Sequence, residues 1–135
     1  MKAIADTGLL VGFLDASDQY HGWAVKCLEA LHATLTTCEG VLAETEYLVP
    51  GSGPFLMEMV RRGTLMVMPM VPAEAGPLAQ LMKRYPRMQF ADACVVRLSE
   101  LLPDAVVYTT DRRDFTVYRR RGREAIKVVF PPGRV

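Results

Sequence analysis

The sequence has few of the residues on which disulfide and zinc scaffolds depend. Its three cysteines, Cys27, Cys38 and Cys94, show no C-x-x-C spacing, which argues against a disulfide framework and against a zinc knuckle. Its two histidines, His21 and His32, are not spaced as a pair of metal ligands, so a zinc hydrolase is not expected. Since each cysteine has apolar neighbours, we expect buried thiols and a reducing, cytoplasmic compartment.

Other common signals are also missing. No stretch approaches the roughly 20 apolar residues of a membrane span, and the first six residues lack the long apolar region of a signal peptide. There is no G-x-S-x-G motif and no glycine loop that would cradle phosphates. These absences argue against a membrane protein, a serine hydrolase and a P-loop enzyme.

The 135 residues predict a single domain, spanning 1–135, with a substantial core. Half of the residues are hydrophobic, 23% are charged, and the net charge is +1. Global charge therefore does not indicate a nucleic-acid binder.

The charge is unevenly distributed, however. Residues 112–134 contain 8 of the 16 lysines and arginines and only two acids, Asp114 and Glu124, so the rest of the chain is net acidic. Five of these basic residues are candidates for contacts with a polyanion: Arg112, Arg113, Arg119, Arg120 and Arg121. A solvated charged surface is an equally good interpretation of the run taken alone, although such asymmetry can steer a polyanion to a site.

Hydrophobic periodicity predicts strands that alternate with helices. The expected strands are 2–5, 35–38, 65–68, 105–109 and 126–130. The expected helices are 9–14, 19–32, 40–49, 55–62, 73–85, 87–102 and a short one at 115–120. This alternation is typical of an α/β domain with a mainly parallel central sheet, which binds ligands beyond the carboxyl ends of its strands.

Four acids interrupt or end apolar runs: Asp6, Glu44, Asp92 and Asp111. A buried carboxylate without a partner is costly, so it either takes up a proton or binds a cation. Asp6 and Asp111 each follow a predicted strand, and Asp92 lies in the first turn of a predicted helix. We therefore expect one shared site that holds a divalent metal.

Ligation by oxygen alone favours Mg²⁺ or Mn²⁺ over zinc or copper. Such an ion can hold a phosphate oxygen and lower the pKa of a bound water. The reaction that fits these residues best is metal-dependent hydrolysis of a phosphodiester.

Each acid also has an ordinary interpretation. Asp6 could cap a helix, Asp92 could complement a helix dipole, Glu44 could pair with a buried arginine, and Asp111 could be a turn residue. Periodicity leaves two further choices open, because Glu46 competes with Glu44 and Asp114 competes with Asp111. Thr109 could place its hydroxyl near the metal, but an ordinary strand threonine is the slightly favoured interpretation.

Four segments together resemble a known family. They are Ala5-Asp6-Thr7-Gly8-Leu9-Leu10, Val41-Leu42-Ala43-Glu44 after Thr36-Thr37, Phe90-Ala91-Asp92-Ala93-Cys94-Val95-Val96, and Thr109-Thr110-Asp111-Arg112-Arg113-Asp114-Phe115. In their order and spacing the chain resembles the PIN-domain ribonucleases, specifically the VapC-type toxins of toxin–antitoxin pairs. Cys94 departs from the pattern, since a small or aliphatic residue is more usual at that position.

The resemblance implies a PIN-like three-layer α/β/α fold and RNA as the substrate. It implies that Asp6, Glu44, Asp92 and Asp111 are the catalytic ligands of Mg²⁺ or Mn²⁺, with Asp114 just outside them, where Thr109 is the other candidate. It thereby selects Glu44 over Glu46 and Asp111 over Asp114. It also implies a homodimer and a cognate antitoxin that covers the cleft, which the arginine run could contact instead of RNA.

Two rival functions remain. A phosphoacceptor signalling domain would need a second acid beside Asp6 and a lysine after the last strand, but residues 5 and 7 are Ala and Thr and no lysine is suitably placed. A catalytically inactive PIN-like module that binds RNA or protein is the other alternative, and the presence of all four acids argues against it.

Overall fold

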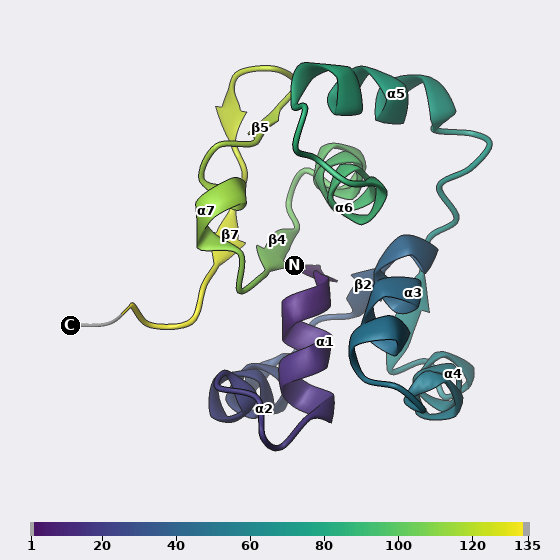
Figure 1. Ribbon diagram of the computed structural model, residues 1–135, viewed down its shortest axis with the longest axis vertical. Helices are drawn as coiled ribbons and strands as arrows, with labels where there is room; N and C mark the ends of the chain where they lie inside the picture. Colours follow the sequence, from purple (N-terminus) through teal and green to yellow (C-terminus); the bar gives the residue numbers. More distant parts are fainter. Residues whose placement is uncertain (1, 134–135) are drawn as a thin grey trace.

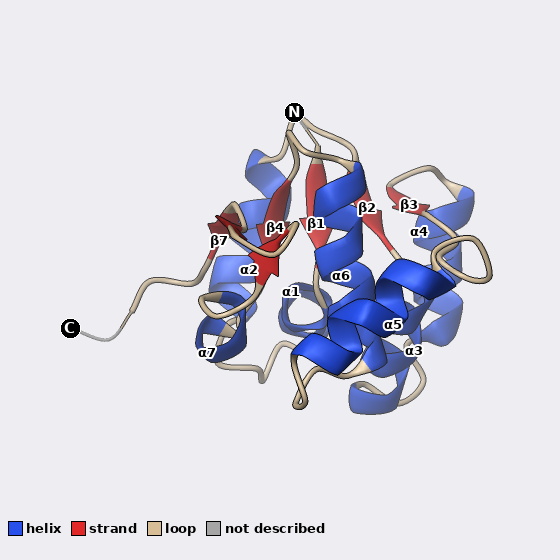
Figure 2. Cartoon of the chain, turned by 90° about the horizontal axis from the view of Figure 1, so that it is seen from above, coloured by secondary structure: helices blue, strands red, loops and turns tan. Residues whose placement is uncertain are grey.

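The computed structural model describes residues 2–133, and five parallel strands form its central sheet (Figure 2). The strands are β1 (Ala3–Ala5), β2 (Leu35–Thr37), β3 (Leu65–Val67), β4 (Val106–Tyr108) and β7 (Val128–Val129), in the order β3-β2-β1-β4-β7. All four neighbouring pairs are parallel. The predicted α/β class with a mainly parallel sheet is therefore confirmed.

Helices cover both faces of this sheet. They are α1 (Thr7–Leu14), α2 (His21–Ala30), α3 (Glu39–Leu48), α4 (Gly53–Arg61), α5 (Ala75–Arg84), α6 (Phe90–Leu101) and the short α7 (Arg112–Phe115). Figure 1 shows α6, with α5 outside it, on one side of the sheet and α1 with α2 on the other, which gives three layers. Over residues 2–133, no helix has both the length and the apolar character needed to cross a bilayer.

The core forms where the central elements have no polar face. All three residues of β1 are fully buried, as expected of a strand covered on both faces. Helix α6 buries Ala91, Ala93 and Cys94 near its start, and these small side chains let it lie close to the sheet. Gly40 serves the same purpose in α3, since a β-carbon there would lie 3.2 Å from the ring of Phe90. This close approach holds α3 beside the start of α6.

The carboxyl edge of the sheet contains a topological switch point. β1 continues through α1 and α2 to its neighbour β2, whereas β4, on the other side of β1, continues to β7. The chain therefore leaves these two adjacent strands in opposite directions, which opens a crevice between them. Asp6 follows β1 and Asp111 follows β4, so both acids lie at this crevice.

The prediction was wrong between residues 112 and 125. The short helix expected at 115–120 lies at 112–115 instead, and residues 119–125 form an antiparallel hairpin of β5 (Arg119–Arg120) and β6 (Glu124–Ala125) that was not predicted. Its turn has positive φ at Arg121 (49°) and Gly122 (82°), with the Arg123 amide bonded to the Arg120 carbonyl at 3.0 Å. Arginine is uncommon in this type I′ geometry, so the sequence carried only half of the usual turn signal.

Candidate metal and RNA-cleavage site

Asp6 is buried, with 5% of its surface exposed, at the junction of β1 and α1. It occupies the N-cap position of α1, yet its side chain makes no capping hydrogen bond. Its carboxylate instead accepts a hydrogen bond of 2.6 Å from the Thr109 hydroxyl at the end of β4. Thr109 Oγ1 also accepts from the Asp111 amide at 3.0 Å, so this threonine connects two of the candidate acids.

Asp92 reaches the same region from the first turn of α6. Its carboxylate accepts a 3.1 Å hydrogen bond from the hydroxyl of Tyr118. The Tyr118 ring is in turn fixed by edge-on contacts with Tyr85 and Phe115, at centroid distances of 5.0 and 5.2 Å. Aromatic packing therefore sets the direction of the Asp92 side chain.

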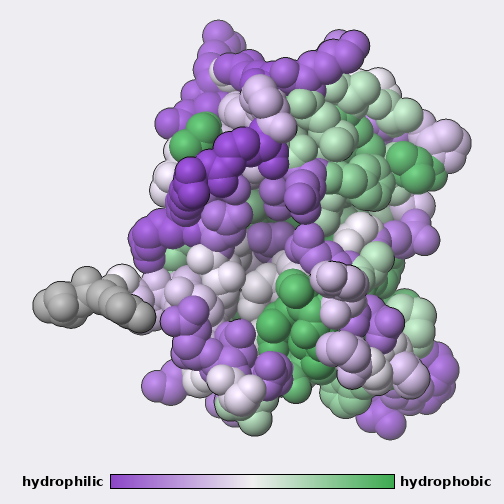
Figure 3. Space-filling model, viewed as in Figure 1, coloured by the Kyte–Doolittle hydropathy of each residue, from purple (hydrophilic) through white to green (hydrophobic). Residues whose placement is uncertain are grey.

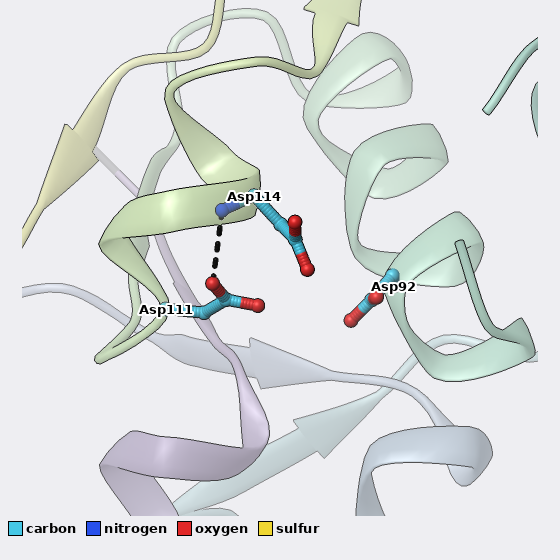
Figure 4. Close-up of side chains that lie close together, drawn as sticks. All are labelled: Asp92, Asp111 and Asp114. Carbon is cyan, nitrogen blue, oxygen red and sulfur yellow. Dashed lines mark hydrogen bonds between the residues drawn. The ribbon is translucent and has the colours of Figure 1, made fainter. Parts of the chain in front are cut away.

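Asp111 and Asp114 complete a cluster of three carboxylates with Asp92 (Figure 4). One oxygen from each lies within 4.8 Å of the others. Asp111 caps α7 through the Asp114 amide, which donates to its Oδ1 at 2.9 Å, and Figure 4 shows its other oxygen turned toward Asp92. The helix-capping and metal-binding interpretations of Asp111 are thus compatible, because each uses a different oxygen.

Glu44 approaches from α3, which contacts both α1 and α6. It lines the same cleft as Asp6, Asp92 and Asp111. Glu46, the competing residue, is exposed and accepts a hydrogen bond from the Gly51 amide at 3.2 Å. The structure therefore brings Glu44, and not Glu46, to the cleft.

This acidic cleft has a volume of about 340 Å³. Within the described part of the chain, no lysine or arginine lines the cleft, and five lining residues are acids: Asp6, Asp18 from the loop before α2, Glu44, Asp92 and Asp111. Asp114, beside the cleft, has a cationic partner, since its Oδ1 lies 4.0 Å from the exposed guanidinium of Arg87. The cleft itself is consequently a concentrated negative region without internal neutralisation.

The pKa values of the cleft carboxyl groups reflect their burial and their closeness to one another. Burial raises the pKa of Asp6 from 3.8 to about 7, with the charges of Asp92 and Glu44 adding to the rise and the Thr109 hydroxyl opposing it. Burial likewise raises the pKa of Asp92 to about 6, and Tyr118 opposes that rise. Burial also raises the pKa of Asp111. Perturbed carboxyl groups gathered in one cleft are typical of functional sites.

The donor set fits a hard divalent cation. The available ligands are carboxylate oxygens, the type that Mg²⁺ and Mn²⁺ prefer. In addition, the buried Thr7 Oγ1, which belongs to a residue lining the cleft, has no hydrogen-bond partner within the described part of the chain. An orphaned buried hydroxyl is unusual, and an ion with its water shell would give it one.

The five candidate RNA-contacting arginines do not form one surface. Arg112 lies over the ring of Phe130, 4.6 Å from its centroid, and donates a hydrogen bond to the Pro131 carbonyl. Arg113 is exposed on α7, whereas Arg120 is buried. Arg119 and Arg121 face a separate pocket beside α5 and α6. Figure 3 shows hydrophilic side chains gathered over α7 and β5 and an apolar area over α1.

Sequence reasoning overlooked two residues of the site. Asp18 reads as an ordinary turn residue, and it does accept from the Tyr20 amide at 2.9 Å, so no signal marked it as part of the cleft. Tyr118 was missed because it lies after the end of α7, in a segment whose path the sequence pattern does not specify, and it reaches Asp92 only through the fold.

Comparison with solved structures finds VapC20 of Mycobacterium tuberculosis, described as a toxin that cleaves the sarcin-ricin loop. The match has a TM-score of 0.65 and 17% sequence identity, and it covers 78% of this chain and 87% of that one. The chain has the PIN-like fold. The three-layer architecture expected from the four motifs is therefore confirmed. No protein-family model matches the sequence, and no curated protein matches it either.

Proposed function

We propose that the protein is a Mg²⁺- or Mn²⁺-dependent endoribonuclease that hydrolyses RNA phosphodiesters in the acidic cleft. The observation that carries this proposal is the convergence of Asp6, Glu44, Asp92 and Asp111 on one cleft whose lining residues include no basic side chain. The PIN-like fold shared with VapC20, an RNA-cleaving toxin, supports the choice of substrate.

Asp92 and Asp111, which were expected as ligands, would hold the ion together with Asp114, which was expected just outside them, since the oxygens of these three already lie together. When bound, the ion supplies Lewis acidity and activates water for attack on phosphorus. Tyr118 holds Asp92 in position, and Thr109 does the same for Asp6. Because these two hydrogen bonds fix the directions of the carboxylates, the site is preorganised for a cation.

Asp6 and Glu44 would supply the remaining negative charge around the ion. With its pKa near 7, Asp6 exchanges a proton near neutral pH. It can therefore bind the ion in its charged form or keep a proton when the cleft is empty. Glu44 lies on a different element, where it would orient the attacking water or hold a second ion.

We further propose that the protein acts in the cytoplasm as the toxin of a toxin–antitoxin pair and forms a homodimer. Three free thiols fit a reducing compartment. Leu48 lines the acidic cleft with 54% of its surface exposed, and its neighbour Tyr47 is 81% exposed. An antitoxin segment with apolar and basic side chains would complement this combination of apolar rim and acidic cleft.

Digestion of a mixed RNA pool tests the central proposal. We expect cuts that require Mg²⁺ or Mn²⁺ and disappear with EDTA. Asp92→Asn should reduce cleavage by at least about 100-fold, because one ligand charge is lost. Asp104→Asn is the matched control, since Asp104 is an exposed acid in the loop after the same helix, and it should cleave like the parent protein. An inactive RNA- or protein-binding module would show no divalent-dependent cuts at all.

A further inference from the structure

A second pocket, which we call the arginine pocket, lies between α5, α6 and the β5–β6 hairpin and has a volume of about 380 Å³. Its basic lining residues are Arg84, Arg97, Arg119 and Arg121, and its single acidic one is Glu100. Figure 1 shows β5 beside the carboxyl end of α5, where Arg84 is the last helical residue. The pocket therefore collects arginines from three separate elements.

Most of this positive charge is not neutralised. Arg97 forms ion pairs with Glu74 at 2.7 Å and with Glu100 at 3.1 Å. By contrast, Arg84 donates to the Gly122 carbonyl at 2.7 Å, and Arg119 donates to the carbonyl of Thr116 at 2.8 Å. Backbone carbonyls fix a guanidinium without cancelling its charge, so the arginines remain available to an anion.

The backbone of Arg121 supports a functional role for its side chain. Its φ of 49° lies in the left-handed region, which asparagine or glycine adopts much more readily than arginine. Its amide donates to Glu100 Oε2 at 2.6 Å, so an acid of the pocket itself holds the turn in place. A strained backbone conformation that is held in place by neighbouring residues indicates that the side chain of Arg121 has a function.

The neighbouring Arg120 adds a further positive charge to the hairpin. It is 5% exposed, and its Nε is buried without a hydrogen-bond partner within residues 2–133. A buried guanidinium nitrogen of this kind raises the local positive potential. Its charge adds to that of the hairpin, although Arg120 itself does not line the pocket.

We propose that the arginine pocket binds a backbone phosphate of the RNA strand that is cleaved in the acidic cleft. The proposal rests on the proposed function. Among residues 2–133, no basic residue lines the acidic cleft, so the RNA strand needs a binding site for its phosphates nearby. Arg119 follows Asp114 of the carboxylate cluster by five residues, so their α-carbons are at most about 18 Å apart. Guanidinium groups bind phosphate oxygens in a bidentate manner, which suits the occupant proposed here.

Arg121→Asn tests this anchor without endangering the fold. Asparagine suits the left-handed turn, so the melting temperature should stay level or rise. RNA binding is measured by fluorescence anisotropy on the Asp92→Asn background, with EDTA present, as a function of salt. The slope of log K against log salt should fall by about 0.7 for each phosphate that the variant no longer neutralises, and Arg84→Gln should behave similarly. Arg61→Gln is the control, because Arg61 is an exposed arginine of α4 whose replacement changes the net charge equally.

An unchanged salt slope in both Arg121→Asn and Arg84→Gln would overturn the proposal while leaving the proposed cleavage intact. An equal reduction in Arg61→Gln would also overturn it, because the effect would then reflect net charge alone. Loss of binding to a polyglutamate probe, with RNA binding preserved, would assign the pocket to an acidic protein instead. Since the binding assay needs no cleavage, failure of the nuclease proposal would appear separately, in the RNA digestion.

Discussion

At the scale of single residues, Asp6 shows how function and stability conflict. Its carboxyl group is buried beside other acids and is stabilised mainly by the Thr109 hydroxyl. A protein selected for stability alone would place an apolar residue there. Burial in this unfavourable environment raises the pKa of Asp6 to about 7.

The metal-free protein should therefore lose stability as pH rises from about 4 to about 7. In that window the native Asp6 keeps its proton while the unfolded chain, with its ordinary pKa of 3.8, has released it. The native state binds more protons, so the free energy of unfolding falls with pH, by on the order of 4 kcal/mol for this group. Stabilisation is complete below the unfolded pKa and is lost as pH passes the folded one. Urea unfolding in EDTA across this range measures the effect.

Asp6→Asn supplies the comparison for this pH dependence. The amide cannot ionise, so its stability curve should be flatter, and near pH 8 the variant should be more stable than the parent protein without metal. Both proteins contain the same histidines and other carboxyl groups, so only the difference between their curves concerns Asp6. Parallel curves would show that Asp6 does not carry the raised pKa.

At the scale of elements, the site depends on how closely α1 approaches the loop after β4. A β-carbon on Gly8 would lie only 1.9 Å from Thr110 Oγ1, so the first turn of α1 fits against this loop only with glycine. That contact keeps the end of β1 next to the start of α7. The pairing of β1 with β4 brings Asp6 and Asp111 to the same cleft, and the missing side chain of Gly8 lets α1 pack against the loop that carries Asp111.

Gly8→Ala should destabilise the protein by about 1–3 kcal/mol, because the loop after β4 must move. It should also weaken divalent binding, since Asp111 moves with that loop. Gly22→Ala in α2 is the matched control, as nothing lies within 4 Å of the added carbon, and it should stabilise slightly, by up to about 1 kcal/mol. Thermal unfolding of both variants with and without Mn²⁺ separates the two effects. Equal stability in the two variants would mean that the Thr110 side chain yields easily.

The lengths of the helices and strands also explain how much of the fold could be predicted from the sequence. Periodicity located the five strands of the sheet and six of the helices, because buried strands and amphipathic helices leave a clear apolar pattern. It failed for the β5–β6 hairpin, where each strand has two residues and the turn uses arginine. Two-residue strands are too short to show a period.

Part of the site was predictable because some of its residues break a clear apolar pattern. Acids within apolar runs, such as Asp6 and Asp92, stand out from their neighbours. Asp18 does not, since it lies in a polar loop and joins the cleft only through folding. The position of Asp114 beside Asp92 and Asp111 depends on the geometry of the short α7, which a sequence pattern does not specify.

At the scale of the whole molecule, the cleft joins segments that are far apart in the chain. Its acids come from the end of β1, the loop before α2, α3, the start of α6 and the loop after β4. An unfolded chain has no such arrangement of carboxylates. Binding of a divalent ion is therefore coupled to the global fold rather than to one local element.

Mn²⁺ should consequently raise the melting temperature of the whole protein. At a free concentration about 100 times the dissociation constant, binding to the native state alone adds about 2.7 kcal/mol, which for a chain of this size corresponds to roughly 10 °C. Asp92→Asn should lose most of this shift, whereas Asp104→Asn should retain it. The shift should also shrink below about pH 6, where protons compete for Asp6 and Asp92. A shift of the same size in Asp92→Asn would place the ion elsewhere, and no shift at neutral pH in the parent protein would contradict metal binding by the acidic cleft without RNA.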